Sequence, residues 1–146
     1  MAMSCMSSAL LTSGSEGQIA SAYNYGKHVG NAFQLYDDVL DFEGKVETMG
    51  KERYVDLKLG LSTAPVLFAM EERHSEMKTL VDRKFSAEGD VRRAVDIIYT
   101  TEAIERSKDL AKVHAQKARE YLSGFDDNEA RRGLDEIARR VVNRDK

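Results

Sequence analysis

The sequence of 146 residues predicts an all-α fold, a bundle of helices. Apolar residues recur at helical spacing through most of the chain, and no segment shows the strict alternation of a half-buried strand. Pro65 is the only proline, so little in the composition interrupts a helix. Alanine, leucine, glutamate, lysine and arginine are abundant, and all five are strong helix formers.

Two helices are expected in the first third of the chain. A short apolar helix covers residues 1–12, and a long one runs from an N-cap at Ser15 to about Phe42. Gly26 and Gly30 interrupt the long helix, where each costs on the order of 1 kcal/mol relative to alanine. We therefore expect another helix or a ligand to approach closely at these glycines.

Periodicity breaks down between residues 43 and 60, where glycines alternate with charged side chains, and we expect a flexible segment there. Ser62 or Thr63 is then expected to cap a short apolar helix, with Pro65 tolerated in its first turn. Further helices are expected over residues 75–84, 90–99, 101–123 and 128–143. These elements predict one domain, or part of one.

Composition excludes several classes of protein. Hydrophobic residues make up 42% and charged residues 32% of the chain, as in a soluble globular domain with a core. The formal net charge of -3 argues against a dedicated nucleic-acid binder. No apolar run approaches the roughly 20 residues of a transmembrane segment. The single cysteine, Cys5, cannot form an internal disulfide, and the apolar start has no basic region typical of a secretory signal.

Three carboxylates lie near the end of the long helix. Asp41 follows Asp37 by four residues and Asp38 by three, so the three carboxylates share one sector of the helix. Like charges at this spacing cost roughly 0.2–0.5 kcal/mol per pair, and the macrodipole disfavours anions at this end, so we expect that nothing in folding rewards the arrangement. Such oxygen ligands suit Mg²⁺, and Gln34 lies one turn earlier.

Basic residues follow the carboxylates in the charged segment. Lys51, Arg53 and Lys58 are available there, and a site that holds Mg²⁺ and a diphosphate needs cations for the remaining phosphate oxygens. The alternative interpretation is a solvated acidic helix end followed by an exposed charged loop. The apolar residues among the aspartates argue against it: Phe33, Leu35, Tyr36, Val39 and Leu40.

Residues 26–42, GKHVGNAFQLYDDVLDF, resemble the second aspartate-rich motif of the trans-type isoprenyl diphosphate synthases, G-x-x-F-Q-x-x-D-D-x-x-D. Residues 49–51 and 56–69 are similar to the segment that follows it in long-chain members. The resemblance is greatest to the polyprenyl (solanesyl or decaprenyl) diphosphate synthases that make the ubiquinone side chain. It implies that residues 1–146 are the carboxyl-terminal portion of an isoprenoid synthase fold.

The resemblance also implies a role for each matching residue. Asp37 is expected to ligate Mg²⁺ at the diphosphate, with Asp38 and Asp41 supporting the metal directly or through water. Gln34 is expected to orient the carboxylates, so Asp37 and Gln34 form the implied catalytic set.

The implied activity is that of a transferase. Lys51 matches a diphosphate-binding lysine of the family, and Lys58 is expected to substitute for a second one that this chain lacks. The reaction is ionisation of an allylic diphosphate, attack by isopentenyl diphosphate and loss of a proton, repeated to lengthen a polyprenyl chain. The family's first aspartate-rich motif has no counterpart here, so we expect the chain to be inactive alone.

Other functions remain open at this point. The chain could be a non-catalytic regulatory subunit that pairs with a complete synthase, or a truncated product with no independent role. A homo- or hetero-oligomer with synthase subunits is expected in the first two cases. Family analogy implies a mitochondrial location, although no targeting segment is visible, and a cytoplasmic location is the alternative.

Overall fold

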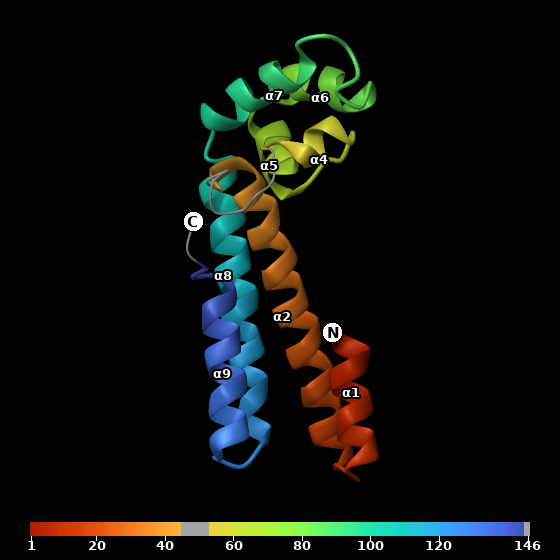
Figure 1. Ribbon diagram of the computed structural model, residues 1–146, viewed down its shortest axis with the longest axis vertical. Helices are drawn as coiled ribbons and strands as arrows, with labels where there is room; N and C mark the ends of the chain where they lie inside the picture. The colour runs from red at the N-terminus through yellow and green to blue at the C-terminus, as the bar shows by residue number, and fades with distance from the viewer. Residues whose placement is uncertain (45–52, 145–146) are drawn as a thin grey trace. The chain divides into compact units, whose positions relative to one another are not determined.

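The structure is a computed structural model that describes residues 1–44 and 53–144 (Figure 1). This part of the chain contains helices and no strand, so the prediction of an all-α fold is confirmed. The helices are α1 (Ala2–Leu11), α2 (Glu16–Glu43), α4 (Val55–Lys58), α5 (Ala64–Glu72), α6 (His74–Asp82), α7 (Asp90–Tyr99), α8 (Ala103–Tyr121), the short 3₁₀ helix η1 (Leu122–Gly124) and α9 (Glu129–Val141). No helix in the described residues is both long and apolar enough to span a membrane.

Side-chain caps explain why two of the helices begin where they do. The Ser15 hydroxyl accepts a hydrogen bond from the Gln18 N–H at 3.3 Å, and the Gln18 side chain accepts one from the Ser15 N–H at 3.0 Å. This reciprocal capping box starts α2 at the predicted residue. Asn128 caps α9 by accepting a hydrogen bond from the Arg131 N–H at 2.9 Å. Thr63 precedes α5, but its side chain makes no capping bond.

The expectation of a flexible segment over residues 43–60 is wrong for its described end. Tyr54 adopts a left-handed conformation with φ of +61°, and α4 follows it directly. A short helix after such a turn depends on contacts with another part of the chain. Lys51 and the rest of residues 45–52 lie outside the described residues.

One compact unit consists of residues 1–34 and 110–144 of the described chain. In Figure 1 it contains α1, most of α2, and α8 beside α9. A hydroxyl inside this unit is satisfied by the backbone, because Tyr25 donates to the Leu134 carbonyl at 2.8 Å. The core comprises Tyr25, Val29, Ala32, Ala115, Ala118, Leu122, Ala138 and Val141.

Gly26 is where α1 and α2 approach closely in this unit. A Cβ atom at Gly26 would lie 2.8 Å from the Cys5 sulfur, 2.9 Å from the Met1 carbonyl oxygen and 3.0 Å from the Ala2 Cα. The expected close approach is therefore confirmed at Gly26, and a helix provides it. At Gly30 a Cβ would meet only the Met1 side chain, at an ordinary contact distance of 3.7 Å.

The second compact unit consists of residues 35–109. It contains the last two turns of α2, the helices α4 to α7 and the start of α8 (Figure 1). Its core is larger and includes Val39, Phe42, Leu57, Val66, Ala69, Met77, Leu80, Phe85, Ala94, Ile97, Ile98, Ala103 and Ile104. Val39 and Phe42 thus anchor in this core the same turns of α2 that carry the three aspartates.

Candidate functional site

The three predicted carboxylates lie in the second unit at the end of α2. Asp38 is only 6% exposed, and Asp37 and Asp41 are half-buried. A buried carboxylate needs polar partners to offset the cost of removing its charge from water. The alternative of a purely solvated acidic helix end therefore does not describe Asp38.

Asp41 connects the end of α2 to the start of α4. Its Oδ1 accepts a hydrogen bond from the Val55 N–H at 3.0 Å, and its Oδ2 accepts one from the Asp56 N–H at 3.3 Å. Its backbone carbonyl also accepts one from the Tyr54 N–H at 3.2 Å. Asp41 therefore satisfies amide groups that the first turn of α4 leaves without partners inside the helix.

Asp38 makes a corresponding contact with α5. Its Oδ2 accepts a hydrogen bond from the N–H of Ala64, the first residue of α5, at 3.4 Å. The positive end of a helix dipole stabilises such an anion. The expectation that nothing in folding rewards these carboxylates is therefore wrong. It considered only α2, whereas the stabilising groups come from residues 14 to 26 positions later in the chain.

Asp56 is a fourth carboxylate that the sequence analysis did not assign to the site. Burial raises the pKa of the Asp56 carboxyl, and the negative charges of Asp41, Asp38 and Asp37 raise it further. The Asp56 carboxyl therefore interacts electrostatically with the three aspartates of α2. In the sequence, Asp56 stands at the start of the segment 56–69 that is similar to the family. Helical spacing could not show that it lies near the aspartates of α2, because it belongs to a different helix.

The donor chemistry of this group fits a hard divalent cation. Aspartate oxygens are the ligands that Mg²⁺ prefers, and a cation would relieve the repulsion that, after burial, raises the pKa of Asp56. In the described residues, no group of three or more histidine, cysteine, aspartate or glutamate side chains is arranged to hold a metal ion. A metal would therefore complete its coordination with water or with ligands from outside these residues, as Mg²⁺ often does.

The predicted basic residues have different positions. Lys58 is exposed at the last residue of α4, whereas Lys51 lies outside the described residues. The Arg53 guanidinium donates to the Phe42 carbonyl and, at 2.8 Å, to the Tyr99 hydroxyl. Arg53 is therefore engaged at the end of α2, and its expected availability for a diphosphate stays a prediction.

Tyr99 also binds the end of α2. Its hydroxyl donates to the Phe42 carbonyl at 2.7 Å, and burial, followed by its interaction with Tyr54, raises the pKa of Tyr99 to about 12. These contacts hold α7 and the segment before α4 against the last turn of α2. Gln34 is exposed on α2, three residues before Asp37, and belongs to the first unit.

Comparison with known proteins places the chain among synthases. The family model described as polyprenyl synthetase matches residues 1–98. The chain is 45% identical to the probable hexaprenyl pyrophosphate synthase, mitochondrial, of Neurospora crassa, over 98% of this chain and 32% of that protein. It is 40% identical to the mitochondrial solanesyl-diphosphate synthase 1 of Oryza sativa, over 98% of this chain and 34% of that protein.

Solved structures agree with the sequence relatives. The apo form of an Arabidopsis medium/long-chain length prenyl pyrophosphate synthase matches with a TM-score of 0.88 at 35% identity, over 99% of this chain and 50% of that chain. A Caulobacter crescentus polyprenyl synthase, solved with calcium and isoprenyl diphosphate, matches with a TM-score of 0.84 at 32% identity, over 98% of this chain and 45% of that chain.

The chain thus spans about a third of the length of these curated relatives and about half of these solved chains. The family match covers most of the chain, including α1, α2 and the four interacting aspartates. The chain belongs to the polyprenyl synthetase family.

Proposed function

We propose that this chain supplies the second aspartate-rich wall of a Mg²⁺-dependent polyprenyl diphosphate synthase. The observation that supports the proposal most is the grouping of carboxylates, in which Asp37, Asp38 and Asp41 at the end of α2 act electrostatically on Asp56 of α4, and Asp41 accepts a hydrogen bond from the Asp56 N–H. The substrates are an allylic diphosphate and isopentenyl diphosphate. In the reaction the allylic C–O bond breaks and releases pyrophosphate, a new C–C bond forms to isopentenyl diphosphate, and a proton leaves.

Each residue has a proposed part in this reaction. Asp37 ligates the metal, while Asp38 and Asp41 hold α5 and α4 in place and use their remaining lone pairs for the metal or its waters. Bound Mg²⁺ would neutralise the negative charge of the diphosphate leaving group. Gln34 orients the carboxylates, and Lys58, together with Lys51, binds diphosphate oxygens.

The chain is proposed to act together with another polypeptide segment. Its relatives are about two to three times as long, and the family's first aspartate-rich motif is absent from this sequence. We therefore expect no chain elongation by this chain alone. A mitochondrial location follows by analogy with the names of the Neurospora and rice proteins. A role in making a quinone side chain is what the resemblance of residues 26–69 implies.

The metal site is tested by Mg²⁺ and inorganic pyrophosphate binding to the chain itself. We expect the two ligands together to raise the melting temperature, and Asp37→Asn to weaken the apparent affinity on the order of 100-fold, as loss of a metal ligand does. Asp96→Asn is the matched control, because Asp96 is exposed on α7. Equal responses of the Asp37→Asn and Asp96→Asn variants would contradict the site assignment.

The rival function is that of a regulatory subunit, which the missing first motif favours. It predicts that the chain changes the rate or the product length of a complete synthase while its own aspartates are dispensable. Mixing the Asp37→Asn variant with a complete synthase distinguishes the two functions. An unaltered regulatory effect of that variant would favour the rival.

A further inference from the structure

Two histidines of the first unit meet between α2 and α8. The Nδ1 atoms of His28 on α2 and His114 on α8 lie 2.8 Å apart, which is a hydrogen-bond distance. Their ring centroids are 5.0 Å apart, and the Tyr121 ring stacks on His28 with centroids 5.7 Å apart. When both imidazoles are neutral, one ring donates through its Nδ1–H and the other accepts with its Nδ1 lone pair.

The separation of these two nitrogens is close to the one that a shared metal ion requires. Imidazole nitrogens bind Zn²⁺ at about 2.0–2.1 Å, so two of them lie about 2.9 Å apart at a right angle and about 3.3 Å apart at a tetrahedral angle. The two Nδ1 atoms must therefore move apart by roughly 0.1–0.5 Å to share an ion. Rotation about the side-chain bonds of the two histidines provides this movement and turns both lone pairs toward the ion.

The surroundings favour the uncharged form of both rings, which is the form that binds metals. Burial, followed by the positive charges of Lys117 and Lys27, lowers the pKa of His28, while Glu120 acts in the opposite direction. Burial, followed by His28 and the same two lysines, lowers the pKa of His114. Both lysines are exposed, so water and salt screen their repulsion of a bound cation.

The pair is accessible to an ion from outside. Both histidines are half-buried, and His28 lines a cavity of about 500 Å³ together with Lys117 and Glu120. No third histidine, cysteine or carboxylate in the described residues is arranged to complete a cluster with them. Water would therefore occupy the remaining coordination positions of an ion bound here.

We propose that His28 and His114 form a binding site for a divalent transition-metal ion of the Zn²⁺ and Ni²⁺ class, which links α2 to α8. Imidazole nitrogen suits these ions, whereas Mg²⁺ prefers oxygen ligands. On binding, the ring that donated moves its proton from Nδ1 to Nε2, so both Nδ1 lone pairs face the ion and no proton is released overall.

This site does not depend on the proposed function, because it shares no ligand with the aspartates at the end of α2. Its two ligands are 86 positions apart in the sequence, so only the folded chain brings them to one ion. A ligand that binds the folded chain and not the unfolded one stabilises the fold. We therefore expect the metal to raise the melting temperature of the chain.

The direct test is Zn²⁺ titration of the chain with ¹⁵N-labelled histidine, followed by NMR and thermal denaturation. We expect the ring signals of His28 and His114 to change together and to saturate at one ion per chain, with a raised melting temperature. His74 is the internal control, because it is exposed on α6, and its signals should not change. Excess Mg²⁺ should not reverse the response. Unchanged signals of His28 and His114, or equal changes at all three histidines, would overturn the proposal.

Variants test which side chains hold the ion. His28→Asn and His114→Asn should each weaken the apparent Zn²⁺ affinity at least ~10-fold, because loss of even an outer partner of a ligand weakens metal binding 10–100-fold. His74→Asn is the matched control and should leave the affinity unchanged, as should Asp37→Asn. A Zn²⁺ affinity that survives His28→Asn, or one that Asp37→Asn abolishes, would overturn the proposal.

Discussion

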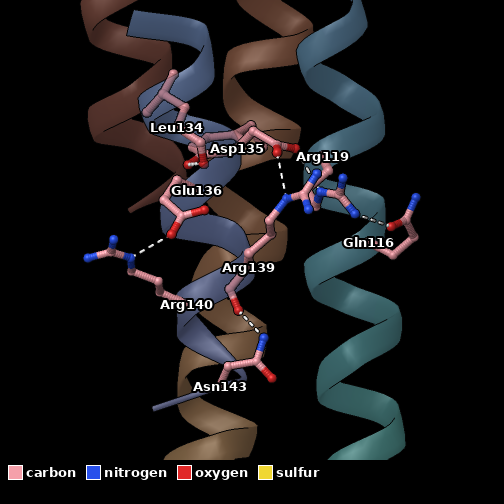
Figure 2. Close-up of polar contacts among 9 residues, drawn as sticks. Gln116, Arg119, Leu134, Asp135, Glu136, Arg139, Arg140 and Asn143 are labelled. Atoms are coloured by element: carbon pink, nitrogen blue, oxygen red, sulfur yellow. Dashed lines mark hydrogen bonds and ion pairs between the residues drawn. The ribbon is translucent and has the colours of Figure 1, made fainter. Parts of the chain in front are cut away.

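The helices α1 and α9 belong to the same compact unit but present opposite surfaces. Ion pairs lie on the exposed part of α9, beside the exposed Leu134 and Ile137: Asp135 binds Arg119 and Arg139, each at 2.7 Å, and Glu136 binds Arg140 at 2.7 Å (Figure 2). The outer side of α1 has no charge at all. A helix surface with paired charges is stable in contact with water. An exposed apolar helix surface without charges instead indicates a contact with another segment.

The inner sides of the two helices differ as well. Ala138 and Val141 of α9 are buried in the core of the unit, and Asn128 caps the helix. The helix α1 has no buried residue and depends on the close approach to Gly26. We therefore expect α9 to be stable in the isolated chain and α1 to be the weaker of the two.

The largest expected difference is between two glycine-to-alanine substitutions, one at Gly26 of α2, which faces α1, and one at Gly133 within α9. Gly26→Ala should destabilise the chain by about 1–3 kcal/mol, because backbone atoms of Met1 and Ala2 lie 2.9 and 3.0 Å from the added atom. Gly133→Ala on α9 should stabilise it by up to about 1 kcal/mol, because nothing lies within 4 Å and alanine is the better helix former. Urea denaturation of both variants measures the difference. Two stabilised variants would mean that α1 is not packed on α2.

A smaller effect is expected from acid acting on α9. The hydrogen bond from Arg119, and then that from Arg139, hold the pKa of Asp135 below its ordinary value of 3.8. Because the folded pKa is the lower one, the stabilisation is fully present above pH 3.8 and is lost as the pH falls through the folded pKa. Asp135→Asn should lower the free energy of unfolding by no more than about 1 kcal/mol at pH 7, and should leave it unchanged below the folded pKa of Asp135.

NMR titration of the Asp135 carboxyl and denaturation curves at several pH values measure this effect. The helix α1 carries no carboxylate, so its packing should not contribute to the loss of folding stability in acid. A stability curve of Asp135→Asn that keeps the full acid dependence of the wild type would argue against the contribution of these ion pairs.

The smallest effect is expected at the exposed end of the α9 network. Arg140 and Glu136 are 78% and 51% exposed, and a pair in such a setting contributes little because water screens it. Arg140→Ala should change the free energy of unfolding by less than about 0.5 kcal/mol. A loss of more than about 1 kcal/mol of unfolding free energy in thermal denaturation would contradict the assignment of this side of α9 as a solvent-exposed surface.

The helices could be predicted because their signals are local. The cap at Ser15, the single proline and the apolar spacing lie within a few residues of the boundaries that they determine. The close approach at Gly26 was predictable too, since a glycine in a helix interior needs a reason, although the sequence could not say that α1 provides it.

The candidate site was predictable only in part, because sequence signals are local and many of its contacts are not. The resemblance identified the carboxylates of α2, but the contacts of Asp41 with Val55 and of Asp38 with Ala64 join residues far apart in the chain. The involvement of Asp56 and the engagement of Arg53 also arise from folding of the segment after α2. Periodicity carries no information about such pairs.

The most direct test of the account is transfer of labelled isopentenyl diphosphate by this chain assembled with the complementary part of the Neurospora synthase. We predict Mg²⁺-dependent incorporation into a polyprenyl product by the assembled pair, none by either part alone, and a loss on the order of 100-fold with Asp37→Asn in an intact complex. Incorporation by the complementary part without this chain, or an unchanged rate with Asp37→Asn, would contradict the account.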